Sequence, residues 1–129
     1  MTQPSILIVD ADVLIRHPLA EYLRECGFRV LEASSTTEAR QVLAEGSLRA
    51  DVVLADADSS GDAFALAAWI RGNRPGVQVI LAGSYAKAAE TAGDLCADGP
   101  MASKPYDHRL LGDEIRRLLA ARDRTEGRD

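Results

Sequence analysis

Two short apolar runs that end in carboxylates constrain the fold of this chain more than any other feature. The runs are Ile6–Val9 and Val52–Ala55, and the acids that follow them are Asp10, Asp12, Asp56 and Asp58. Short runs rich in Val and Ile are typical of strands buried on both faces of a parallel sheet. If the two strands are neighbours, their carboxylates meet at one sheet edge, where they repel one another unless a cation lies among them. Since Mg²⁺ prefers oxygen ligands, the sequence predicts a small acidic, metal-dependent pocket.

Strand and helix signals alternate five times, which indicates an α/β fold with a parallel sheet. The expected strands are Ser5–Asp10, Phe28–Ala33, Asp51–Asp56, Val77–Ala82 and a short one near Met101–Ser103. Right-handed crossovers leave few topologies for such units. The sequence therefore predicts a doubly wound, five-stranded sheet of order 2-1-3-4-5 with helices on both faces, the flavodoxin-like arrangement.

Helix start signals follow the first three expected strands. Asp12 and Asp62 are candidate N-caps, and Ser35 with Glu38 forms a capping box. Pro18 predicts a kink or a late start in the first helix. The weakest helix signal is the Ala-rich segment Ala86–Leu95, which we expect to pack loosely. The last helix is expected from Asp107, with fraying in the charged segment from Ala121 onward.

Composition excludes several classes of protein. The chain has 129 residues, enough for one domain, which we expect to cover residues 1–122 with a flexible tail at 123–129. A net charge of −5 argues against direct nucleic-acid binding. No run of apolar residues is long enough for a membrane span, and the N-terminus lacks the features of a signal peptide. Cys26 and Cys96 are therefore expected to be reduced thiols in a cytoplasmic protein.

The predicted topology brings the acids together with a basic residue. In the order 2-1-3-4-5, ligands bind beyond the carboxyl ends of the first and third strands. Asp10, Asp12, Asp56 and Asp58 fall there, and Lys104 approaches from the end of the fifth strand. A metal, an acceptor carboxylate and an ammonium group form a site for phosphoryl transfer. The central acid, Asp56, would be the nucleophile and would form an acyl phosphate.

With these residues in order, the chain resembles the receiver domain of bacterial two-component response regulators. The resemblance covers roughly Ile6 to Leu119. Its landmarks are Asp10, Arg16, Gly27-Phe28-Arg29-Val30, Glu38-Ala39, Asp51 with Asp56, and Lys104-Pro105. Each motif is weak alone, but their order and spacing together are specific.

The resemblance implies a role for each matching residue. Asp56 would accept a phosphoryl group from a histidine kinase or phosphorelay partner. Asp10, Asp56 and the backbone carbonyl of Asp58 would bind Mg²⁺. Lys104 would contact the phosphoryl group. The peptide bond between Lys104 and Pro105 would be cis, and the proline would fix the position of Lys104. Beyond self-phosphotransfer and autodephosphorylation, no enzyme activity is expected.

The chain departs from the family pattern at several positions. Ala11 replaces the second acid of the metal-binding pair. Asp12 lies one residue too late for that position, so its main predicted role is that of a helix cap, and metal binding is the less favoured alternative. The hydroxyl residue that grips the phosphoryl group aligns with Gly83, although Ser84 is adjacent. The aromatic switch residue aligns with Met101.

Two functions remain open from the sequence. In the first, the chain is a stand-alone receiver phosphorylated on Asp56, which signals through contacts with a downstream protein and can form a homodimer. In the second, Ala11 marks a pseudo-receiver, a protein-interaction module that works without phosphorylation. We expect no output domain after residue 120, so the output would be a partner protein, a phosphorelay step or a domain outside this sequence.

Overall fold

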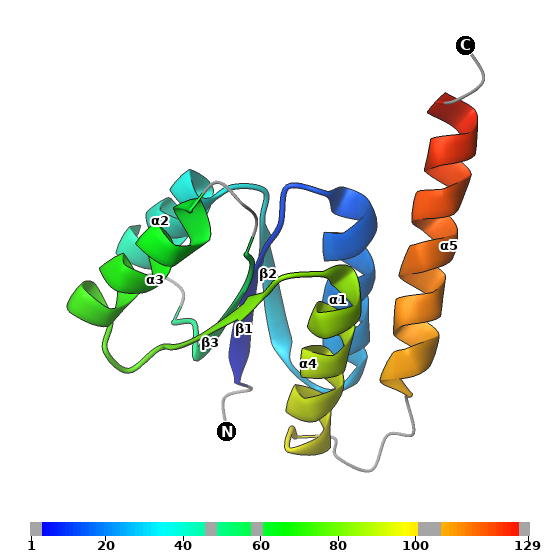
Figure 1. Cartoon of the computed structure of the whole chain (residues 1–129). Helices are drawn as coiled ribbons and strands as arrows, with labels where there is room; N and C mark the ends of the chain where they lie inside the picture. The colour runs from blue at the N-terminus through cyan, green and yellow to red at the C-terminus, as the bar shows by residue number, and fades with distance from the viewer. Residues whose placement is uncertain (1–3, 46–48, 58–60, 101–106, 127–129) are drawn as a thin grey trace.

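The computed structural model describes residues 4–45, 49–57, 61–100 and 107–126 of the chain. Strands and helices alternate along the described residues from the first strand to the fourth helix, and a fifth helix follows (Figure 1). The strands are β1 Ser5–Val9, β2 Arg29–Ala33, β3 Val52–Asp56 and β4 Gln78–Ala82. The helices are α1 Val13–Glu25, α2 Thr36–Glu45, α3 Asp62–Asn73, α4 Tyr85–Ala97 and α5 His108–Glu126.

The four described strands form one parallel sheet in the order β2-β1-β3-β4. This agrees with the first four strands of the predicted order. The predicted fifth strand, near Met101–Ser103, lies outside the described residues. In the register of the two central strands, Val9 pairs with Ala55. The next residues, Asp10 and Asp56, therefore end neighbouring strands at the same edge of the sheet.

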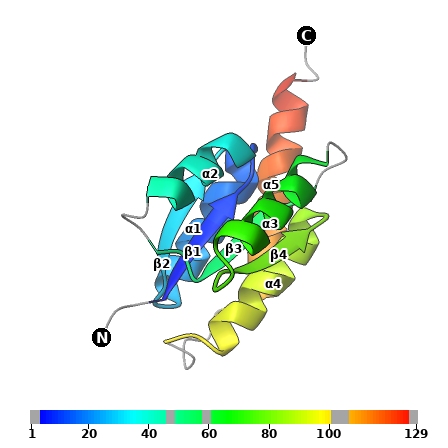
Figure 2. The same ribbon diagram turned by 90° about the vertical axis from the view of Figure 1, so that its left-hand side faces the viewer.

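Helices cover both faces of the sheet. Because alternate side chains of β1 point to opposite sides, this strand packs against helices on both faces. Ile6 and Ile8 pack with residues of α1, α4 and α5, whereas Leu7 and Val9 pack with residues of α2 and α3. Figures 1 and 2 show the resulting three layers, with α2 and α3 on one side of the sheet. The apolar run of β1 is thus buried completely, as its composition predicts.

Two predicted helix caps are confirmed and one is wrong. Asp12 caps α1, accepting a hydrogen bond from the Leu14 N–H at 3.0 Å. The Ser35 hydroxyl accepts from the Glu38 N–H at 3.1 Å, which is half of the predicted capping box; the Glu38 carboxylate accepts instead from the Ser34 hydroxyl, also at 3.1 Å. At α3 the cap is Gly61, whose φ of +82° favours glycine, and Asp62 is instead the first helical residue. α1 begins at Val13 with Pro18 inside it, so the late start does not occur.

α4 packs more closely than its composition suggested. Its small side chains Ala88, Ala89, Thr91 and Ala92 are buried against the core. Because Ala and Thr let the helix axis approach its neighbours, α4 lies against both α1 and α5.

The expectation of two reduced cysteines is wrong. Cys26, the C-cap of α1, forms a disulfide with Cys96 in the last turn of α4, and their Cα atoms lie 5.4 Å apart. That spacing is within the usual range for a disulfide. Neither the number of cysteines nor the expected cytoplasmic location indicates this pairing, because it is the packing of α4 on α1 that brings together residues 70 positions apart.

α5 continues to Glu126, well past the expected onset of fraying at Ala121. It docks through Leu111 and Ile115, which are 5% and 0% exposed. None of the helices in the described part of the chain is long and apolar enough to cross a membrane.

Candidate functional site

Asp10 is a buried carboxylate held by backbone contacts at the end of β1. Only 9% of the residue is exposed. Its N–H donates to the Ala33 carbonyl at 3.0 Å, and its Oδ1 accepts from the Asp12 N–H at 2.8 Å. Burial, and then the negative charges of Asp56 and Asp12, raise the pKa of Asp10 to about 6 despite that hydrogen bond. A positive charge near Asp10 would relieve this penalty.

Asp56 lies beside Asp10 at the end of β3, and its residue is exposed. Both carboxylates line a hollow of about 240 Å³, which also includes Asp62 of α3 and hydroxyl residues of the β2–α2 loop. The hollow is large enough for a hydrated cation and a small anion. The sequence predicts Asp62 only as a helix cap, because a separation of six residues from Asp56 does not indicate that the start of α3 returns to the same edge.

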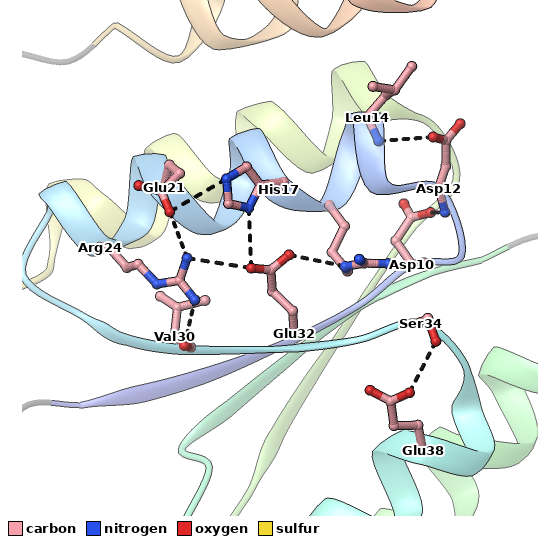
Figure 3. A network of polar contacts seen from close by, with 11 residues as sticks. Asp10, Asp12, Leu14, His17, Glu21, Arg24, Val30, Glu32, Ser34 and Glu38 are labelled. Atoms are coloured by element: carbon pink, nitrogen blue, oxygen red, sulfur yellow. Dashed lines mark hydrogen bonds and ion pairs between the residues drawn. The ribbon is translucent and has the colours of Figure 1, made fainter.

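Asp12 follows Asp10 in the β1–α1 loop, but both oxygens of its carboxylate already have partners. Oδ1 accepts from the Leu14 N–H at 3.0 Å, as Figure 3 shows. Oδ2 accepts from Nη1 of Arg122 at 2.8 Å. In this structure Asp12 therefore acts as a helix cap and an ion-pair partner of α5.

Arg16 of α1 links the end of β1 to β2 through two hydrogen bonds. Its Nη1 donates to the backbone carbonyl of Asp10, and its Nε donates to Oε1 of Glu32 on β2, both at 3.0 Å. The other oxygen of Glu32 lies 3.4 Å from Nδ1 of His17 and from Nη1 of Arg24 (Figure 3). Burial disfavours the Glu32 carboxylate, but these basic partners outweigh it and hold the pKa of Glu32 below its usual value. The network fixes α1 and the Asp10 backbone relative to β2.

Ser84 and Gly83 lie on the other side of Asp56, after β4. Ser84 caps α4, its hydroxyl accepting from the Lys87 N–H at 3.1 Å. It also lines a small cavity together with Asp10 and Asp56. Gly83 is exposed, and a Cβ atom there would meet nothing within 4 Å. Ser84 therefore lies next to the acidic edge, while its hydroxyl is engaged in the cap of α4.

Three predicted site residues, Asp58, Lys104 and Met101, lie outside the described residues, as does the predicted cis bond to Pro105. Within the described part of the chain, no three carboxylate, imidazole or thiol side chains converge closely enough to hold a metal ion. A cation at Asp10 and Asp56 would therefore complete its shell with water or with backbone oxygens.

Comparison with known proteins gives one curated relative with similarity along nearly the whole chain. The transcriptional regulatory protein GltR of Pseudomonas aeruginosa is 36% identical over an alignment of 131 positions, which covers 96% of this chain. The chain spans 52% of the length of that relative. No protein-family profile matches the chain.

Solved structures with the same fold include signal receiver domains. One is a response regulator receiver domain protein from Clostridium thermocellum, 25% identical with a TM-score of 0.54, covering 93% of this chain and 97% of that one. Another is the signal receiver domain of an HD domain-containing protein from Pseudomonas fluorescens Pf-5, 25% identical with a TM-score of 0.58 and the same two coverages.

Proposed function

Because this chain is a response regulator receiver domain of two-component signalling, we propose that it accepts a phosphoryl group on Asp56. The donor would be a histidine kinase or a phosphotransfer protein. The observation that carries the proposal is the pairing of the exposed Asp56 with the buried Asp10 at the end of the two central strands, beside a hollow of about 240 Å³.

The chemistry at Asp56 follows from its position. One carboxylate oxygen forms a bond to phosphorus while the phosphorus–nitrogen bond of the phosphohistidine donor breaks, which leaves an acyl phosphate on Asp56. Ser84 and Lys104 are the proposed hydrogen-bonding and charge partners of the phosphoryl oxygens. Ser84 already lines the cavity next to Asp56. Gly83 leaves space beside it.

The donor set at this edge suits Mg²⁺. Asp10 and Asp56, with the proposed carbonyl ligand of Asp58, offer only oxygen atoms. The raised pKa of Asp10 reflects a buried carboxylate that a cation would stabilise in its ionised form. When bound, Mg²⁺ would neutralise the negative charge that builds up between the carboxylates and the incoming phosphoryl group.

Phosphorylation is tested by intact mass measurement after incubation with Mg²⁺ and a small-molecule phosphodonor. We expect one phosphoryl adduct, which is lost in Asp56→Asn and when EDTA is added first. Asp62→Asn is the matched control, because it removes one acid from the same hollow and keeps the acceptor. An adduct of the same yield in Asp56→Asn would contradict the proposal.

The alternative function is a phosphorylation-independent pseudo-receiver. Two observations favour it: Ala11 supplies no carboxylate, and no three metal-binding side chains converge within the described residues. The variant Ala11→Asp separates the two functions. If the site is otherwise intact, Ala11→Asp increases both Mg²⁺ affinity and phosphorylation; if neither changes and the folded wild-type protein takes no phosphoryl group, the pseudo-receiver is the better description.

We propose that signalling proceeds through a protein partner or a second copy of the chain, in the cytoplasm, without direct binding to nucleic acid or membrane. A hollow of about 470 Å³ between α4 and α5, lined by Tyr85, Ala89 and Gly112 with charged residues around them, is a surface that a partner could use. The relative GltR is a transcriptional regulator of which this chain matches only part.

A further inference from the structure

One ion pair joins the acidic edge to the far end of the chain. Asp12, in the β1–α1 loop, contacts Arg122 of α5 at 2.8 Å across 110 residues of sequence. The side chains are 25% and 39% exposed, so the pair is partly shielded from water. It connects the last turns of α5 to the loop that immediately follows Asp10.

The contact determines what the Asp12 carboxylate can do. Its backbone N–H donates to Oδ1 of Asp10, which places the Asp12 backbone against one of the two residues of the proposed cation site. Its Oδ1 caps α1, and its Oδ2 is bonded to Arg122. Since Ala11 has no side-chain oxygen, Asp12 is the acid in this loop that could become a further ligand. Coordination through Oδ2 would place a divalent cation next to the positive guanidinium of Arg122, and the repulsion between the two favours separation of Oδ2 from Arg122.

We propose that Arg122 is a positioning residue for the cation site, because it withholds the Asp12 carboxylate from a divalent cation bound at Asp10 and Asp56. The proposal rests on the Mg²⁺ dependence in the proposed function. Cation binding and docking of the α5 end then compete for one carboxylate oxygen.

The competition has a reciprocal consequence. If Arg122 weakens cation binding, the cation must weaken the Asp12–Arg122 contact by the same factor. Partly exposed ion pairs contribute modestly, so releasing Asp12 should strengthen cation binding by about two- to five-fold. Mg²⁺ should also speed amide exchange in the last turns of α5.

The test is a double-mutant cycle on Mg²⁺ affinity, measured by titration calorimetry. The variants are Arg122→Gln, Asp12→Asn and the combination of both. Arg116→Gln is the matched control, since it removes the same charge from α5 but its partner, Asp113, belongs to the same helix. We expect Arg122→Gln to tighten Mg²⁺ binding in the wild-type background and to have no effect when Asp12 is already Asn.

Other outcomes would overturn the inference. An equal effect of Arg122→Gln in both backgrounds, or an equal effect of Arg116→Gln, would mean that Arg122 acts only through its charge. Wild-type binding that Arg122→Gln leaves unchanged would refute the role of Arg122 while preserving the metal site. Absence of Mg²⁺ binding in both the wild type and Arg122→Gln would refute the metal-dependent function itself. Unchanged α5 amide exchange at saturating Mg²⁺ would also contradict the competition.

Discussion

At the scale of single residues, Asp10 shows that the acidic edge is built at a cost to stability. Its pKa of about 6 in the folded protein compares with 3.8 as the ordinary value. Because folding raises this pKa, the contribution of Asp10 to stability is greatest below about pH 4 and is lost as the pH rises through about 6. Above that pH the ionised carboxylate destabilises the fold.

We therefore predict that Asp10→Asn stabilises the metal-free protein near neutral pH. One pKa unit corresponds to about 1.4 kcal/mol, so the gain is about 1–3 kcal/mol. Chemical denaturation at about pH 7 and about pH 4 measures it, and the gain should vanish at the lower pH. Added Mg²⁺ should stabilise the wild type but not Asp10→Asn. A loss of stability in Asp10→Asn at neutral pH would contradict this account of the buried charge.

A second prediction at this scale concerns Gly83. No atom lies within 4 Å of a Cβ placed there, so Gly83→Ser should change the free energy of unfolding by less than about 1 kcal/mol. If the proposed site is correct, the added hydroxyl should change the rate of phosphorylation or the lifetime of the acyl phosphate. Ala86→Ser, on the exposed surface of α4, is the control. Unfolding of Gly83→Ser would show that the space is not accessible to a side chain.

At the scale of elements, α5 depends on a narrow apolar stripe. Ile115 is 0% exposed, whereas Leu110 on the same helix is 65% exposed. Most side chains of α5 are polar or exposed, so the helix docks through the few apolar side chains that reach the core.

We predict that Ile115→Ala lowers the free energy of unfolding by about 2–5 kcal/mol, because it leaves a cavity under α5. Leu110→Ala, the matched control, should change it by less than about 1 kcal/mol. Urea denaturation followed by circular dichroism measures both. Equal effects of the two substitutions would mean that α5 is not docked in the way described.

At the scale of the whole molecule, the Cys26–Cys96 disulfide links α1 to α4. It closes a covalent loop of the chain that contains β2, β3 and β4. A loop that spans 70 residues restricts the unfolded chain strongly. The chain-entropy model gives a stabilisation of about 4 kcal/mol for a loop of this length. In a reducing compartment, two equivalents of a thiol reductant would convert the bridge to two thiols.

We predict that a dithiol reductant lowers the midpoint of urea unfolding, by up to the equivalent of about 4 kcal/mol. Cys26→Ala/Cys96→Ala should unfold at a similarly reduced midpoint, and reductant should have no further effect on it. Thiol counting on the denatured protein establishes the redox state. Two free thiols in protein purified without reductant would contradict the disulfide.

Much of the local structure could be predicted because it depends on neighbours in sequence. The continuous apolar run of β1 predicts a strand buried on both faces, and Asp12 and Ser35 cap the helices they precede. The convergence of Asp10 and Asp56 needed one further premise, the strand order, which right-handed crossovers restrict.

The long-range contacts could not be predicted, because nothing local determines them. Cys26 meets Cys96, and Asp12 meets Arg122, only where α4 and α5 pack beside α1. The sequence alone determined the four described strands, the helix caps Asp12 and Ser35, and the two acids Asp10 and Asp56, since each follows from side-chain pattern and backbone propensity. The tertiary structure alone decided that the two cysteines pair and that Arg122 is the ion-pair partner of Asp12, because side-chain packing sets how helices distant in sequence approach one another.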